Sequence, residues 1–155
     1  MEREHLYLPG DPDEVSDPIP LKGGTAALLY MRGNRPNQQD ALWAGVHENQ
    51  LIVCSSDGVS NSDKGDEMAK WVVEFGRRSA IAQISSVGIV DVLEMQEYIR
   101  DAINKRDSLH RGQATGLCMV IDAPNVRAHR VGDPDTRIDR EIFPHAALVP
   151  ENKRF

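Results

Sequence analysis

The sequence lacks several features that would each indicate a particular class of protein. It contains no apolar run near the roughly 18–20 residues that a membrane-spanning helix needs. Residues 1–5 are mostly charged, where a secretory signal would lead into an apolar stretch. Neither a Gly-x-x-x-x-Gly-Lys-Ser/Thr loop nor a Gly-x-Gly-x-x-Gly segment after a strand-like run is present. We therefore expect a cytoplasmic protein that neither associates with membranes nor uses a known nucleotide-binding motif.

Cysteine is scarce and positive charge is in deficit. Cys54 and Cys118 each lie in a short apolar run, and the simplest interpretation is a pair of buried thiols in a reduced compartment. The 155 residues include 18 Lys and Arg against 24 Asp and Glu, a formal net charge of −6. This balance argues against nucleic acid as a partner, because phosphate backbones select basic surfaces. An apolar share of 40% is sufficient for the core of a single domain.

The predicted elements occur in the order strands, helices, strands. Residues 2–22 are rich in proline and acidic residues, which predicts an irregular, mostly exposed N-terminal arm before a domain at residues 23–155. Apolar runs and helical spacing predict strands at 25–31, 41–46, 50–55, 116–122 and 126–131, and helices at 66–75 and 90–106. Elements segregated in this way favour an α+β domain over alternating βαβ units.

Two carboxylates stand where a strand-like run meets a loop. Asp40 precedes the run that begins at Ala41, and Asp57 follows the run that ends near Ser55. If these runs form an antiparallel hairpin, both carboxylates lie at its open end. Carboxylates are the ligands that Mg²⁺ and Mn²⁺ prefer, and Gly58 has no Cβ to keep a metal from its carbonyl oxygen. The alternative is that Asp57 belongs to an ordinary Asp-Gly turn and Asp40 is only a loop residue.

Several short segments resemble motifs of a known enzyme family. Residues 35–41, Arg-Pro-Asn-Gln-Gln-Asp-Ala, resemble the first motif of the PP2C family of metal-dependent serine/threonine phosphatases. Residues 52–59, an apolar run that ends in Asp-Gly, are similar to its second motif. Residues 113–115, Gln-Ala-Thr, occupy the place of its Gly-Thr-Thr, and residues 131–133 are similar to its Val-Gly-Asp turn. These matches follow the family's order across roughly residues 25–140.

The resemblance implies a metal centre in this chain. Asp40 and Asp57 would be metal ligands, with Asp57 bridging two Mn²⁺ or Mg²⁺ ions and the carbonyl of Gly58 completing one site. The implied reaction is attack by a metal-activated water on phosphoserine or phosphothreonine, with no covalent enzyme intermediate. A phosphoprotein is the partner that follows from this reaction.

Other positions receive roles from the same resemblance. Arg35 would hold the substrate phosphate through its planar guanidinium, which makes it, with the two metal-binding aspartates, part of the catalytic set. Gln39 stands where many members carry Glu, so it could orient a metal-bound water but would contribute no charge. Thr115 and Asp133 would support the metal ligands.

The sequence also departs from the family's pattern. Val59 occupies a position where some members have His, and no counterpart of the family's downstream metal-binding aspartates follows residue 133. The implied metal site is therefore incomplete. The alternative function is a catalytically inactive, phosphatase-derived binding or regulatory module.

The fold that the resemblance implies is a β-sandwich of two antiparallel sheets flanked by helices, incomplete at its C-terminal end. An incomplete sandwich leaves apolar sheet surface open. We therefore expect a homo-oligomer, a partner chain that covers the open sheet, or a rearranged terminus.

Overall fold

A central antiparallel hairpin organises the structure. The computed structural model describes residues 1–34, 36–59, 64–109, 112–122, 125–132 and 147–151. Strand β6 (Asp40–His47) pairs with β7 (Gln50–Asp57) through the turn residues Glu48 and Asn49, whose φ angles are 47° and 66°. Positive φ at both central residues matches the twist of the flanking strands and favours a two-residue hairpin. The hairpin predicted from the two apolar runs is confirmed.

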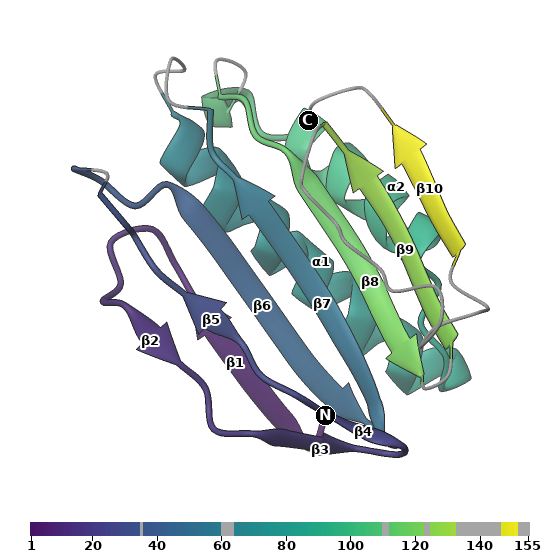
Figure 1. The fold of residues 1–155 in the computed structure, drawn as a ribbon. Helices are drawn as coiled ribbons and strands as arrows, with labels where there is room; N and C mark the ends of the chain where they lie inside the picture. The colour runs from purple at the N-terminus through teal and green to yellow at the C-terminus, as the bar shows by residue number, and fades with distance from the viewer. Residues whose placement is uncertain (35, 60–63, 110–111, 123–124, 133–146, 152–155) are drawn as a thin grey trace.

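The hairpin lies within a six-stranded sheet of the described residues, in the order β1-β6-β7-β8-β9-β10 (Figure 1). Neighbouring strands are antiparallel except β10, which runs parallel to β9. The additional strands are β1 (Arg3–Tyr7), β8 (Gly116–Asp122), β9 (Asn125–Val131) and β10 (Ala147–Glu151). The predicted hairpin at 116–131 corresponds to β8 and β9.

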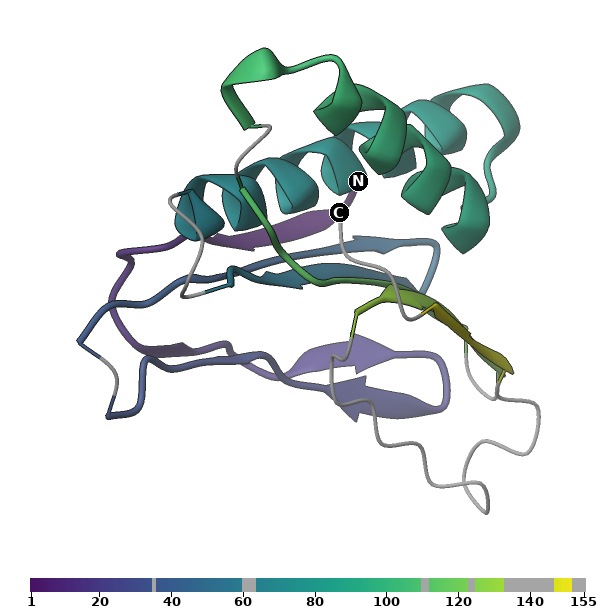
Figure 2. The ribbon, with the colours of Figure 1, turned by 90° about the horizontal axis from the view of Figure 1, so that it is seen from above.

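Helices α1 (Gly65–Val87) and α2 (Val92–Asn104) cover one face of this sheet (Figure 2). The first core lies between the helices and the sheet. Its buried residues include Trp43 and Ile52 of the sheet and Met68, Val72 and Ile99 of the helices. Both helices agree with the apolar spacing, although α1 continues through residues 82–87, which give no clear sequence signal. Neither helix is long and apolar enough to span a membrane.

Two short strand pairs cover part of the opposite face. They are β2 (Glu14–Val15) with β5 (Leu29–Tyr30), and β3 (Ile19–Leu21) with β4 (Gly24–Ala26). Their side chains form a second core with the main sheet, whose buried residues are Tyr7, Ile19, Leu28, Tyr30, Ala44, Val46, Leu51 and Val53. The six-stranded sheet therefore has a buried hydrophobic cluster on each face. The short helix η1 (Asp107–Leu109) follows α2 in the chain.

Two expectations about the N-terminal part are wrong. Residues 2–22 are not irregular throughout, because they supply β1, β2 and β3, and Tyr7 and Ile19 are buried. The single strand expected at 25–31 is divided between β4 and β5. The physical reason is that this segment covers an apolar sheet face, which requires buried side chains. Pro20 is compatible with that role, since it lies in an edge strand. The expected α+β class is confirmed.

Candidate functional site

Asp40 and Asp57 are direct partners at the open end of the β6–β7 hairpin. Facing residues of an antiparallel pair share a sheet face and hold their Cβ atoms roughly 4.5–5.5 Å apart. On β6 this face continues with Leu42, and on β7 with Val53, both of which contact the second core. The carboxylates therefore belong to the face that carries the short strand pairs, away from the helices.

A pocket of about 470 Å³ opens beside this carboxylate pair. Its polar lining comes from three parts of the chain. The segment that leads into β6 supplies Tyr30, Gln38 and Asp40. The end of β7 supplies Ser55 and Asp57, and the residue before β8 is Thr115. Asp40 is half-buried and Asp57 is exposed. A small polar ligand could therefore reach both carboxylates from solvent.

Thr115 holds the backbone of Asp57 in place. The Asp57 N–H donates to Thr115 Oγ1 at 3.2 Å, and the Thr115 N–H donates to the Asp57 carbonyl at 2.9 Å. The buried Ser56 hydroxyl donates to the Thr115 carbonyl at 2.6 Å. Sequence reasoning placed Thr115 among the supporting residues, and in the structure Thr115 contacts the backbone of Asp57.

Gly58 is enclosed by backbone on two sides. Its N–H donates to the Gln39 carbonyl at 3.2 Å, and it forms an isolated bridge with Ala114. A Cβ at this position would overlap the backbone of Gly65 and lie 2.9 Å from the Gln39 carbonyl oxygen. The structure thus brings the backbone of Gln39, next to Asp40, against the residue that follows Asp57.

Tyr30 is a site residue that the sequence reasoning missed. Its hydroxyl oxygen lies 2.7 Å from the Leu8 carbonyl oxygen and 2.8 Å from that of Asp40, so the hydroxyl donates to either. Burial raises the pKa of Tyr30 well above 10, and the negative charges of Asp11, Asp40 and Asp13 raise this pKa further. No local sequence pattern indicates this role, because it depends on contacts with backbone carbonyls that lie 22 and 10 residues away in the sequence.

The raised pKa of Tyr30 predicts a stability effect at high pH. Above about pH 10 the unfolded chain loses the phenol proton while the folded chain keeps it, so stability falls as pH rises. We expect the free energy of unfolding, measured by urea denaturation, to decrease more steeply above pH 10 in the wild type than in Tyr30→Phe. Equal slopes would contradict the structure around this hydroxyl. Below pH 10 the phenol contributes no pH dependence.

No family model, curated protein or solved structure matches this chain. The functional proposal therefore depends on the residues of the site. Two residues of the predicted catalytic and supporting set, Arg35 and Asp133, lie outside the described residues. Asp40, Asp57, Gly58, Gln39 and Thr115 are all described, and the structure brings these five together.

The carboxylate pair fits a hard divalent cation in its donor chemistry. Asp40 and Asp57 supply anionic oxygen ligands on one face, and Mg²⁺ is commonly held by one or two carboxylates with water in its other positions. Across the described parts of the chain, no group of three or more His, Cys, Asp or Glu side chains is placed to hold one ion. The described residues thus fit one partly hydrated cation, while a second ion would need ligands from elsewhere.

Proposed function

We propose that this chain is a metal-dependent protein serine/threonine phosphatase of the PP2C type. The observation that carries the proposal is the direct pairing of Asp40 with Asp57 beside a solvent-accessible pocket. The motif resemblance predicts the same two residues as metal ligands. The layered arrangement, with helices outside one face and short strands against the other, supports the same family because a flanked β-sandwich has this order of layers (Figure 2).

Asp40 and Asp57 would hold Mn²⁺ or Mg²⁺, with the carbonyl of Gly58 as a further ligand. The cation would neutralise phosphate charge and lower the pKa of a water molecule. The chain's own contribution is positional. Thr115 fixes the backbone of Asp57, and Tyr30 ties the backbone of Asp40 to the N-terminal segment.

A binding or regulatory module without catalysis is the second candidate. The observation that favours it is that the described residues offer two facing carboxylates and no third ligand of the same kind within reach of one ion. A two-metal phosphatase obtains much of its transition-state stabilisation from both ions. A module with one weak cation site could bind a phosphoprotein without hydrolysing it.

The first experiment measures turnover by the purified chain. We expect Mn²⁺ to activate hydrolysis of p-nitrophenyl phosphate and of a phosphothreonine peptide, and EDTA to abolish both activities. Isothermal titration with Mn²⁺ provides a readout that does not depend on turnover. Metal-independent hydrolysis would overturn the proposal. Mn²⁺ binding without hydrolysis at saturating metal would favour the binding module instead.

A further inference from the structure

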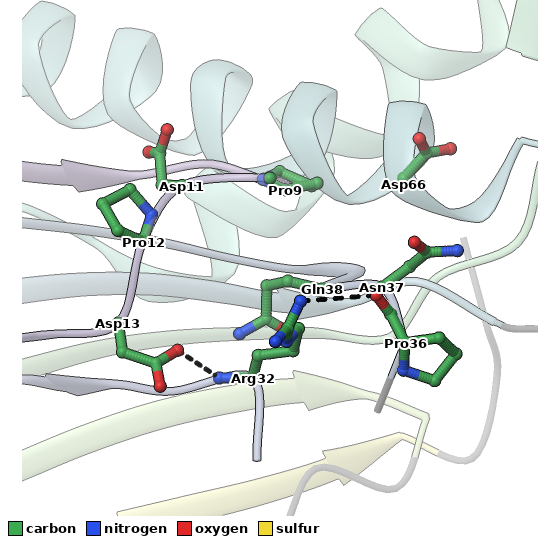
Figure 3. A pocket seen from close by; sticks show the side chains of 10 residues that line it. Pro9, Asp11, Pro12, Asp13, Arg32, Pro36, Asn37, Gln38 and Asp66 are labelled. Atoms are coloured by element: carbon green, nitrogen blue, oxygen red, sulfur yellow. Dashed lines mark hydrogen bonds between the residues drawn. The ribbon is translucent and has the colours of Figure 1, made fainter. Parts of the chain in front are cut away.

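Two groups of polar or reactive side chains lie outside the carboxylate pair. One lines a pocket of about 560 Å³, where Asp11 and Asp13 each accept a backbone N–H, that of Arg32 in the case of Asp13 (Figure 3). These bonds hold neighbouring loop segments together, which gives both carboxylates a structural role. The other group is the pair of thiols of Cys54 and Cys118, which lies in the first core.

Cys54 and Cys118 face each other across two neighbouring strands. They are direct partners in the β7–β8 pairing, and both are free thiols that are fully buried. The Cys118 thiol donates to Cys54 Sγ across 3.8 Å. The two sulfurs are therefore neighbours without any rearrangement of the strands.

The backbone separation of facing strand residues suits a disulfide. Facing residues of an antiparallel pair hold their Cα atoms roughly 4.5 or 5.5 Å apart, and a disulfide accepts Cα separations of roughly 4.4–6.8 Å. The sulfurs must approach from 3.8 Å to a bond of roughly 2 Å. Rotation of the two side chains, with a slight approach of their Cβ atoms, provides this movement.

The packing around Cys54 favours a disulfide over a bound metal ion. The backbone of α1 lies directly above the sulfur, since a Cβ added at Gly76 would be 2.5 Å from Cys54 Sγ. Among the residues that the structure describes, no third His, Cys, Asp or Glu side chain joins the two thiols as a metal ligand. A disulfide needs no added volume, because it draws the two sulfurs toward each other.

We infer that Cys54 and Cys118 are a redox-modification site, at which a small disulfide such as glutathione disulfide converts the two thiols into one reversible bond between β7 and β8. Strand β7 ends at Asp57, and Thr115 directly precedes β8. The bond therefore fastens the strand pair that continues into the hydrogen bonds between Asp57 and Thr115. This inference goes beyond the proposed phosphatase function and does not depend on it.

The bond forms by two exchange steps. The thiolate of one cysteine attacks a sulfur of glutathione disulfide, which forms a mixed disulfide and releases one glutathione thiolate. The second protein thiolate attacks the protein sulfur of the mixed disulfide, forms the Cys54–Cys118 bond and releases the other glutathione. The two protein sulfurs are oxidised and the two glutathione sulfurs are reduced. The two protons of the protein thiols pass to the released glutathione thiolates.

The surroundings of the thiols make this exchange slow in the folded chain. The hydrogen bond to Cys54 and burial both raise the pKa of the Cys118 thiol, so little thiolate is present at neutral pH. Glutathione disulfide reaches the sulfurs only when the helical layer opens locally. The redox state is therefore measured at equilibrium, approached from both the reduced and the oxidised chain.

The first test measures the redox state of the folded chain. The chain is incubated in buffers with graded ratios of glutathione disulfide to glutathione and quenched with acid. N-ethylmaleimide then labels the remaining thiols in urea, and the intact mass counts them. As the ratio rises, we expect the doubly labelled chain to be replaced by an unlabelled one. A peptide digest should link Cys54 to Cys118 within a single chain, and dithiothreitol should reverse the change.

The second test compares the stability of the two redox forms. The bond joins residues 64 positions apart, so it restricts the unfolded chain, and we expect it to raise Tm by roughly 5–15 °C. Hydrogen exchange at the amides of Asp57 and Thr115 should also be slower in the oxidised form. Unchanged exchange at both amides would overturn the inference that the bond fastens the site.

The variants Cys54→Ala and Cys118→Ala assign these effects to the thiol pair. Each is compared with itself in reducing and oxidising buffer, and its Tm should not rise on oxidation. The inference is overturned if the wild type keeps two labelled thiols at every ratio, links only between chains, or melts at a lower temperature when oxidised. No readout involves turnover, so these results do not depend on whether the chain is a phosphatase.

Discussion

Asp57→Asn is expected to lower Mn²⁺-dependent hydrolysis by at least about a hundredfold, the loss typical of removing one electrostatic contribution to a transition state. The amide keeps the size of the side chain and one acceptor oxygen but removes the negative charge that a divalent cation requires. Because Asp57 is exposed, the substitution should barely change stability. The measurements are kcat/KM for p-nitrophenyl phosphate and the Kd for Mn²⁺ by isothermal titration.

A matched control for this variant is Asp122→Asn. Asp122 ends β8 beside the start of β7, at the opposite end of the sheet from the candidate site, and accepts a hydrogen bond from Gln50. It should retain wild-type turnover and Mn²⁺ affinity. If Asp57→Asn binds Mn²⁺ as the wild type does, the assignment of Asp57 as a metal ligand is wrong, whether or not the chain is an active enzyme.

Gly58→Ala is expected to destabilise the fold by about 1–3 kcal/mol, the usual cost of overpacking. The added methyl would overlap the backbone of Gly65, where α1 begins, and approach the carbonyl of Gln39. Backbone atoms cannot rotate away as a flexible side chain can, so the connection between β7 and α1 must shift. Thermal or urea denaturation measures the loss, and Mn²⁺ affinity should fall with it because Asp57 directly precedes this residue.

Gly24→Ala provides the comparison, because nothing lies within 4 Å of its Cβ position and its φ is not in the left-handed region. We expect its stability to stay within about 0.5 kcal/mol of the wild type. A loss at Gly58→Ala no larger than that at Gly24→Ala would show that the contact between Gly58 and Gly65 is looser than the structure indicates.

The central hairpin could be predicted because its signals are local. Two apolar runs lie on either side of a short polar turn, and the register that this turn imposes places Asp40 opposite Asp57. The helices were also predictable from apolar residues at helical spacing. The last turns of α1 were not, since buried Gln83 lies there. Its amide bonds to Ser79 and to the backbone of Asp91, which a hydrophobic period cannot indicate.

The two short strand pairs β2–β5 and β3–β4 could not be predicted because their strands are only two or three residues long. Such strands are too short to display a period, and their burial depends on the sheet face that they cover. Tyr30 and Gln38 could not be predicted as site residues either, because their place in the site depends on tertiary contacts. Each contacts the backbone of Asp40 from a segment whose own sequence indicates only a strand end or a loop.

The short strand pairs have a consequence for the dynamics of the site. Elements held by few backbone hydrogen bonds open locally at lower free energy than a long-stranded sheet, and their amides exchange with solvent sooner. The wall of the pocket that includes Tyr30 belongs to this weaker layer, whereas Asp57 belongs to the central sheet. Transient opening of residues 14–30 would thus widen access to the carboxylates while the β6–β7 register that pairs them persists.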